Sequence, residues 1–147
     1  MSRRRLDEDW LRGRASLGAA AGWTPEEIRI VAELGFGLAE QGRNEEAITV
    51  FEGLAAVAPA TAYFQSALGA LKLRTGDLES ALIHLNAALS ADPTDLSALG
   101  NKGEVLMLLG HREAAVSNLQ AVLRLSEADA ADGLAVRARA LLARLTE

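Results

Sequence analysis

The sequence predicts an all-α protein, a solenoid of three tandem helical hairpins with one helix before them and a capping helix after them. Three observations support this prediction. The 147 residues are 50% hydrophobic but only 4% aromatic, and a composition dominated by alanine and leucine favours closely packed helices. Apolar residues recur at helical spacing. Most specifically, the sequence repeats itself with a period of 34 residues, as repeat architectures do.

Four columns of residues define the repeat. They are Gly35, Gly69 and Gly103; Gly42, Gly76 and Gly110; Ala47, Ala81 and Ala115; and Phe51, Leu85 and Leu119. We expect the first and third columns to let two helices approach closely, because a larger side chain would hold them apart. We expect the second column to end a helix, because glycine readily takes a positive φ. The units are 28–61, 62–95 and 96–129, and Pro59 and Pro93 end the second helices of the first two.

Each unit should contain two helices. The expected first helices are 28–41, 62–75 and 96–109, and the second ones 45–57, 78–91 and 113–125. Thr24 should cap the first of them. The predicted domains are 1–23, an N-terminal helix over Leu6–Leu17 with a glycine-rich joint; 24–129, the three units; and 130–147, the capping helix. Its expected apolar face comprises Leu134, Ala138, Leu141, Leu142 and Leu145.

Composition argues against several functional classes. The net charge of −5 does not suit a general nucleic-acid binder. The basic start of the chain is followed by acidic residues rather than a long apolar run, so we expect neither a signal peptide nor stable membrane insertion. Zero cysteines exclude thiolate chemistry and fit the cytoplasm. His84 and His111 lie in different units and are expected at the surface, so we predict no metal, no cofactor and no enzymatic activity.

In stacked helical hairpins, the first helices line the concave face. Small residues with a few large apolar ones suit the side chains of an extended peptide. The predicted peptide-binding groove comprises Arg29, Ala32, Glu33, Phe36, Glu40, Tyr63, Ser66, Ala70, Leu73, Arg74, Asn101, Glu104 and Met107. We expect charged residues at positions 36 and 63 to abolish binding without changing the fold.

The repeat resembles the tetratricopeptide repeat from Ile28 to about Asp129, which implies a right-handed α-solenoid. The sequence departs from the pattern at Lys72 and Lys102, where other units have leucine, and at Glu127, which replaces the third proline. Some proteins of this class bind acidic chaperone tails through a cationic clamp. Of the matching positions here only Asn101 is of a suitable type, so that ligand is not expected.

The layout is also similar to that of the chaperones of type III secretion translocators. The runs "LRGRASLGAAAGWTPEE", "ELGFGLAEQGRNEEAITVFEGLAAVAP", "ALGALKLRTGDLESALIHLNAAL" and "GEVLMLLGHREAAVSNLQ" carry this resemblance. It implies a partner protein whose extended apolar segment is held in the groove, and a homodimer formed through the N-terminal helix. Two alternatives remain open: a general adaptor for a multiprotein complex, and a structural repeat domain that acts through its convex face or terminal helix. The residues do not identify the client.

Overall fold

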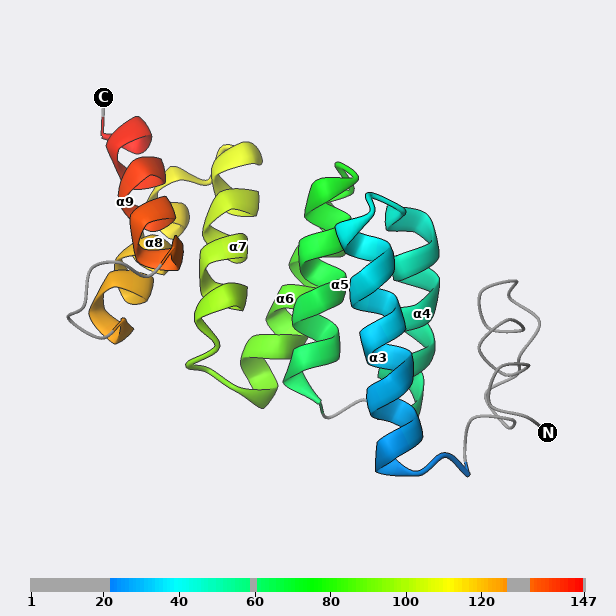
Figure 1. Ribbon diagram of the computed structural model, residues 1–147. Coiled ribbons are helices and arrows are strands. Elements are labelled where there is room, and N and C mark those ends of the chain that lie inside the picture. The colour runs from blue at the N-terminus through cyan, green and yellow to red at the C-terminus, as the bar shows by residue number, and fades with distance from the viewer. Residues whose placement is uncertain (1–21, 59–60, 127–132, 147) are drawn as a thin grey trace.

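The computed structural model describes residues 22–58, 61–126 and 133–146, and this part of the chain is helical with no strands (Figure 1). The helix expected over Leu6–Leu17, Pro59 and Glu127 lie outside these residues. The helices, labelled as in Figure 1, are α3 (Pro25–Glu40), α4 (Asn44–Val57), α5 (Ala62–Arg74), α6 (Leu78–Ala91), α7 (Leu96–Leu108), α8 (Arg112–Leu125) and α9 (Gly133–Leu145). The predicted hairpins are confirmed, with helix ends displaced by no more than a few residues.

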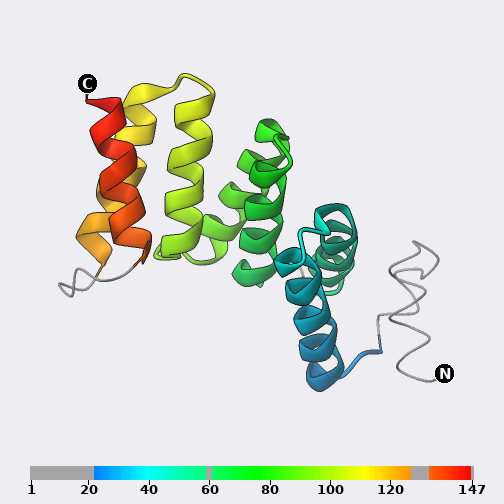
Figure 2. The same cartoon turned by 45° about the horizontal axis from the view of Figure 1, so that its top comes forward.

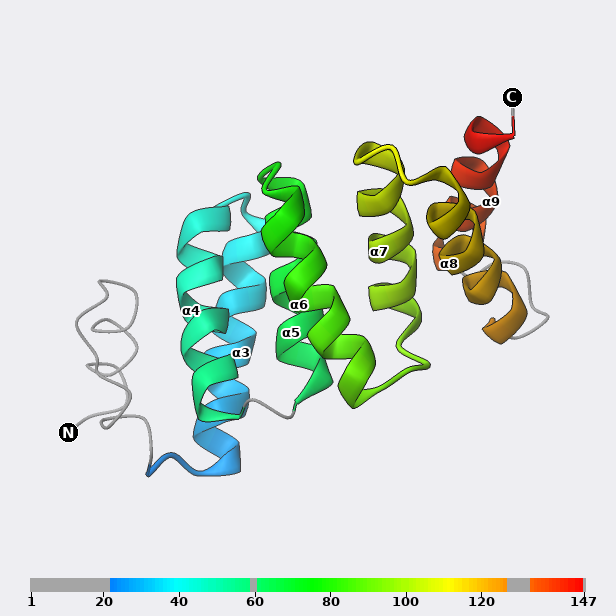
Figure 3. The same ribbon diagram turned by 180° about the vertical axis from the view of Figure 1, so that it is seen from behind.

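The helices form two layers. Helices α3, α5, α7 and α9 lie on the side seen in Figure 1, and α4, α6 and α8 lie on the side seen in Figure 3. Each helix packs on the next one along the chain, and α7 also contacts both α5 and α9. Figure 2 shows α5, α7 and α9 side by side, with the α3–α4 pair inclined to them. We call α3, α5, α7 and α9 the first-helix layer, and the other three the second-helix layer.

Glycine ends the first helix of every hairpin, as expected. Gly42, Gly76 and Gly110 have φ of 76°, 83° and 85°. In the first turn, Gly42 donates its N–H to the carbonyl of Ala39, and the next residue, Arg43, donates to the carbonyl of Leu38. These two bonds satisfy carbonyls that the helix end would leave unpaired. At the other end of α3, the Thr24 side chain accepts the N–H of Glu27 at 3.2 Å and confirms the predicted cap.

The remaining glycine column marks the closest approach within each hairpin. A Cβ built on Gly35 would lie 2.8 Å from the Phe51 ring. The same addition at Gly69 would lie 2.4 Å from the Leu85 side chain, and at Gly103 2.7 Å from that of Leu119. The facing alanines, Ala47, Ala81 and Ala115, are completely buried. The predicted reason for these columns, close packing of two helices, is therefore confirmed.

Helix α9 covers the end of the solenoid. The five residues predicted for its apolar face pack into one cluster with Leu99, Leu119 and Val122 of α7 and α8. Burying this face shields apolar surface that the last hairpin would otherwise expose to water. The predicted capping helix is confirmed.

Substituting Gly69 by alanine should destabilise the protein by about 1–3 kcal/mol, because Leu85 is fully buried and cannot move away from the added methyl group. Gly37 is the matched control, since it lies within α3 and a Cβ there would have no neighbour within 4 Å. Gly37→Ala should stabilise by about 0.5–1 kcal/mol. Urea unfolding followed by circular dichroism measures both, and equal effects would contradict the close-approach argument.

Candidate functional site

A hollow opens between α3, α4 and α5, with a volume of about 160 Å³. Apolar residues line most of it: Phe36, Ala39, Phe51, Ala67, Ala70 and Leu71. Two charged residues, Glu40 and Arg74, complete its lining. We call these eight residues the Phe36 hollow. Phe36, Glu40, Ala70 and Arg74 were predicted for the groove, so the structure brings these four together.

The hollow exists because small and aromatic residues meet at the junction of the first two units. The Phe36 ring lies edge-on to that of Phe51, with centroids 5.0 Å apart, and 5.2 Å from the ring of Tyr63. The alanines at positions 67 and 70 of α5 leave space opposite Phe36. A larger side chain at either alanine would fill that space. The cavity is therefore a gap between an aromatic cluster and a helix surface of small residues.

Tyr63 extends the apolar surface beyond the hollow. Its side chain is 54% exposed although its ring contacts both Phe36 and Phe64. Partial burial raises the pKa of the Tyr63 hydroxyl, so the group stays a neutral donor and acceptor over a wider range of pH. An exposed aromatic ring with a polar end is suited to contact a protein ligand.

Phe36 does not fit the expectation that a charge could replace it without harm to the fold. It is half-buried and packs against a core cluster that contains the fully buried Phe51. A charged side chain there would lose its hydration and its ring contact together. Tyr63 is the position where a charge tests binding alone. Phe51 was assigned to packing from the sequence and yet lines the hollow, because its ring contacts both Phe36 of α3 and Phe64 of α5.

The two charges of the hollow differ in their surroundings. The Nη1 atom of Arg74 donates to the carbonyl oxygen of Ala39 and to Oδ1 of Asn44, each at 3.1 Å. These bonds tie the end of α5 to the turn between α3 and α4. The Glu40 side chain is exposed and forms no hydrogen bond or ion pair with any described residue. Arg74 thus has a fixed position, whereas Glu40 projects into solvent at the rim.

Four other predicted groove residues lie apart from the hollow. Arg29 pairs with Glu26 and Glu33, each at 2.5 Å, on the exposed surface of α3. The hydrogen bond to Glu26 and the two negative charges raise the pKa of Arg29. Ala32 and Ser66 are only 7% and 6% exposed. These two small residues serve the helix packing and offer a ligand little surface.

The remaining predicted residues contact the helices toward the other end of the solenoid. Leu73 packs on the cluster between α6 and α7, and Met107 on the cluster beneath α9. Asn101 lines a narrow crevice of about 10 Å³ between α7, α8 and α9. Glu104 forms an ion pair with Arg137 of α9. The sequence pattern had no means to show this pair, because it depends on where α9 docks.

A polar group connects α4, α5 and α6. Nδ1 of His84 lies 2.9 Å from Oε1 of Gln65, and Lys72 lies 3.9 Å from the carboxylate of Glu52. His84 was expected at the surface but is half-buried. Burial lowers its pKa and the charge of Lys72 lowers it further, while Glu52 and Asp77 act in the opposite direction.

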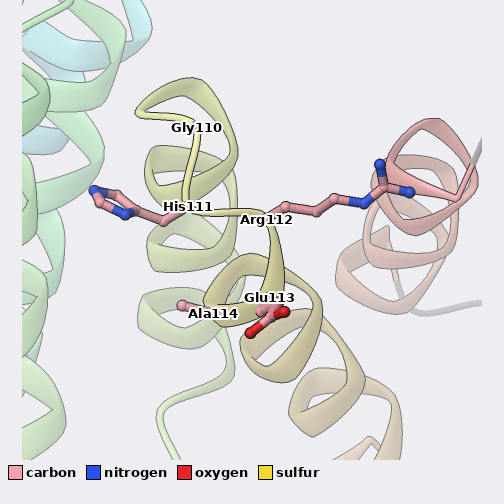
Figure 4. Close-up of a pocket in the computed structure, with 5 residues that line it drawn as sticks. All are labelled: Gly110, His111, Arg112, Glu113 and Ala114. Atoms are coloured by element: carbon pink, nitrogen blue, oxygen red, sulfur yellow. The ribbon is translucent and has the colours of Figure 1, made fainter.

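A second depression, of about 460 Å³, lies at the turn between α7 and α8 and is lined by residues 110–114. Its side chains do not converge: Figure 4 shows His111 and Arg112 pointing in opposite directions. Without convergent groups it is a weak candidate for a site. Within residues 22–58, 61–126 and 133–146, no group of three or more acidic residues or histidines could hold a metal ion. No helix among these residues is long and apolar enough to cross a membrane.

A family model described as tetratricopeptide repeat matches residues 62–95 and 96–129. These residues are tetratricopeptide repeats. The hairpin of α3 and α4 makes the same close glycine contact as these two repeats, so the described solenoid has three units of one design.

Solved structures extend the likeness to nearly the whole chain. PcrH from Pseudomonas aeruginosa has a TM-score of 0.79 and 25% identity, over 86% of this chain and 96% of that one. PcrH in complex with the chaperone-binding region of PopD has a TM-score of 0.78 and 25% identity, over 85% and 95%. The Yersinia enterocolitica type III secretion chaperone SycD, with a peptide of the translocator YopD, has 0.77 and 20%, over 84% and 95%. The fold is that of these chaperones. No curated protein sequence matches the chain.

The melting temperature should fall as the solution becomes mildly acidic, and His84 should account for part of the fall. The folded chain holds this histidine at a lower pKa than its ordinary 6.5, so the unfolded chain takes up the proton first. The stability that depends on neutral His84 is complete above pH 6.5 and is lost as pH falls below that value. Calorimetry at about pH 7.5 and about pH 5.5 should show a smaller fall for His84→Gln than for the wild type. Exposed His111 is the control, and an equal fall in both substitutions would contradict the assignment.

Proposed function

We propose that this protein is a non-catalytic chaperone that holds an extended apolar segment of a secreted, translocator-like client across its first-helix layer. The observation that carries the proposal is the position of the Phe36 hollow on the layer formed by the first helices. Support comes from PcrH, which matches over almost its entire length and is known in complex with the chaperone-binding region of PopD, and from SycD, which is known with a peptide of the translocator YopD. Both chains are then cytoplasmic until the client is secreted.

The size of the hollow favours a peptide side chain over a small molecule. Sites for drug-sized ligands have volumes of about 300–1,000 Å³, whereas the hollow has about 160 Å³. One apolar side chain of an extended chain suits that space, and the exposed ring of Tyr63 provides a second contact beside it. A client segment that would aggregate in water buries its apolar side chains there instead.

The oligomeric state is part of this proposal. SycD has also been solved as an alternative dimer. We propose that this chain likewise forms a homodimer, through residues 1–23. Light scattering of the full-length protein measures this directly.

A general adaptor is the second candidate, because stacked helical repeats form extended concave surfaces that can bind partner proteins. The two candidates differ in the solubility that they imply for the client when it is expressed without this protein. A chaperone's client is insoluble without its partner, whereas the ligand of an adaptor is a soluble protein that meets the solenoid after folding.

Purification from the native organism should recover one client in about equimolar amount, and this client should be insoluble when expressed alone and soluble when co-expressed. Tyr63→Asp should remove most of it, because a charge on the exposed ring position disrupts the apolar contact. Ile83→Asp is the matched control, since Ile83 is 68% exposed on α6 in the other layer. Both variants should melt within a few degrees of the wild type. Retention of the client by Tyr63→Asp would reject the first-helix layer as the binding surface, and a client soluble on its own would favour the adaptor.

A further inference from the structure

A ring contact and a pair of hydrogen bonds join the first hairpin to the two ends of α5. Near the beginning of α5, the ring of Tyr63 contacts that of Phe36. At its end, Nη1 of Arg74 donates to the carbonyl of Ala39 and to the side chain of Asn44. The apolar residues that α5 contributes to the hollow lie between these two contacts. We call the two bonds from Arg74 the Arg74 link.

The link crosses the most open part of the first-helix layer. Helices α5 and α7 approach each other closely, and so do α7 and α9, whereas α3 and α5 make much less direct contact. Figure 2 shows the hairpin of α3 and α4 inclined to the helices that follow. Packing of α4 on α5 holds the two hairpins together, but it acts on the other layer. The spacing of α3 and α5 is therefore not set by direct packing of these two helices.

The sequence provides this link at one junction only. One repeat later, the position of Arg74 is occupied by Leu108, and that of Asn44 by Leu78. Leucine has no side-chain donor or acceptor, so the second and third units cannot be joined in this way. They pack directly through α5 and α7 instead. The polar link thus occurs where the hollow lies and where the first helices are least closely packed.

Geometry and charge both suit the Arg74 link to fix a position. Nη1 of a guanidinium group carries two hydrogens in fixed directions, one for each of the two acceptors. The last turn of α3 contains no basic residue, although partial negative charge collects at the carbonyl end of a helix. Arg74 brings a cation from the next unit to that end. The turn between α3 and α4 is consequently held at one place relative to α5.

Building on the proposed function, we propose that the Arg74 link fixes the spacing of α3 and α5 and so keeps the hollow in the shape that receives the client's apolar side chain. Arg74 is then a positioning residue, which acts on the client through Ala39 and Asn44. A site that is already ordered binds more tightly, because less freedom is lost on binding. Asn44 does not line the hollow, so its substitution changes the link without removing a contact to the client.

Distances between spin labels in the full-length protein test the geometry. The chain has no cysteine, so introduced cysteines take the labels specifically, and excess unlabelled protein restricts the signal to distances within one chain. Exposed Ala56→Cys on α4 and Ala87→Cys on α6 report on the first two units. Ala87→Cys with Gln120→Cys on α8 is the control pair. Asn44→Ala should broaden the distance distribution of the first pair and leave that of the second unchanged.

Peptide binding tests the consequence for the site. The probes are linear peptides of about twelve residues, selected by phage display on the wild-type protein and kept if Tyr63→Asp abolishes their binding. In fluorescence anisotropy, Asn44→Ala should weaken such a peptide by about two- to tenfold, the effect of one lost hydrogen bond. Arg74→Met should weaken it at least as much, and the double variant no more than Arg74→Met, because both changes remove the same link. Asn86→Ala, the same substitution at an exposed position of α6, is the control and should bind like the wild type.

A direct ion pair between Arg74 and an acidic residue of the peptide would give a different result. Both acceptors of the link are uncharged, so the loss of affinity in Arg74→Met should be similar at about 50 mM and about 500 mM NaCl. A direct ion pair would be screened by salt, and Asn44→Ala would not reproduce its loss. Either of these results overturns the positioning role. Melting temperatures within a few degrees of the wild type show that each variant is folded.

These experiments separate the role of the link from the proposed function. Wild-type affinity in Asn44→Ala overturns the positioning role while binding in the hollow stands, and an unchanged distance distribution overturns the fixed spacing. A library that yields no peptide dependent on Tyr63 overturns the proposed function and the positioning role together. The spacing of α3 and α5 is then still decided by the spin labels, which need no ligand.

Discussion

The close approach of two helices at a glycine is the constraint on which the rest of this structure depends. In each hairpin the first helix places a glycine where the second helix places a large buried side chain, and no room remains for a methyl group. This contact lets the two helices of a hairpin pack closely. The hairpins stack along the chain, with their first helices in one layer and their second helices in the other. Because the helices are divided into two layers, one face of the solenoid consists of first helices only, and this face carries the candidate site.

The first unit uses the same contact with a different side chain, and the candidate site follows from that difference. Where the other units have Leu85 and Leu119, the first has Phe51, whose ring reaches past Gly35 to meet Phe36. The ring cluster formed there faces the small residues of α5, which cannot fill the space. A hollow therefore occurs at the junction of the first two units. Its apolar lining results from the packing of the first hairpin, which places the Phe51 ring there.

The far end of the same layer is closed rather than open. Helix α9 covers the last unit, buries Met107 in part and brings Arg137 to Glu104. The surface is consequently asymmetric, with an open apolar hollow at α3 and α5 and a covered end at α7 and α9.

Most of the fold was predictable from the sequence because its determinants are local and periodic. A glycine that must take a positive φ, such as Gly76, and a small residue at a close contact, such as Gly69, act within one hairpin and recur at a fixed interval. Helix ends and the apolar face of α9 follow from similar short-range rules. The groove was predictable only in part, since helical spacing gives the face of a residue but not its neighbours on other helices.

By itself, the sequence determined the all-α class, the three hairpins, the capping helix and the layer to which Phe36, Tyr63 and Arg74 belong. Only the tertiary structure decided that Ala32 and Ser66 are buried, that Phe51 lines the hollow, and that Glu104 pairs with Arg137. The physical reason is the range of the interactions. Backbone conformation and helix periodicity depend on neighbours within a few residues, whereas burial and ion pairing depend on how separate helices meet.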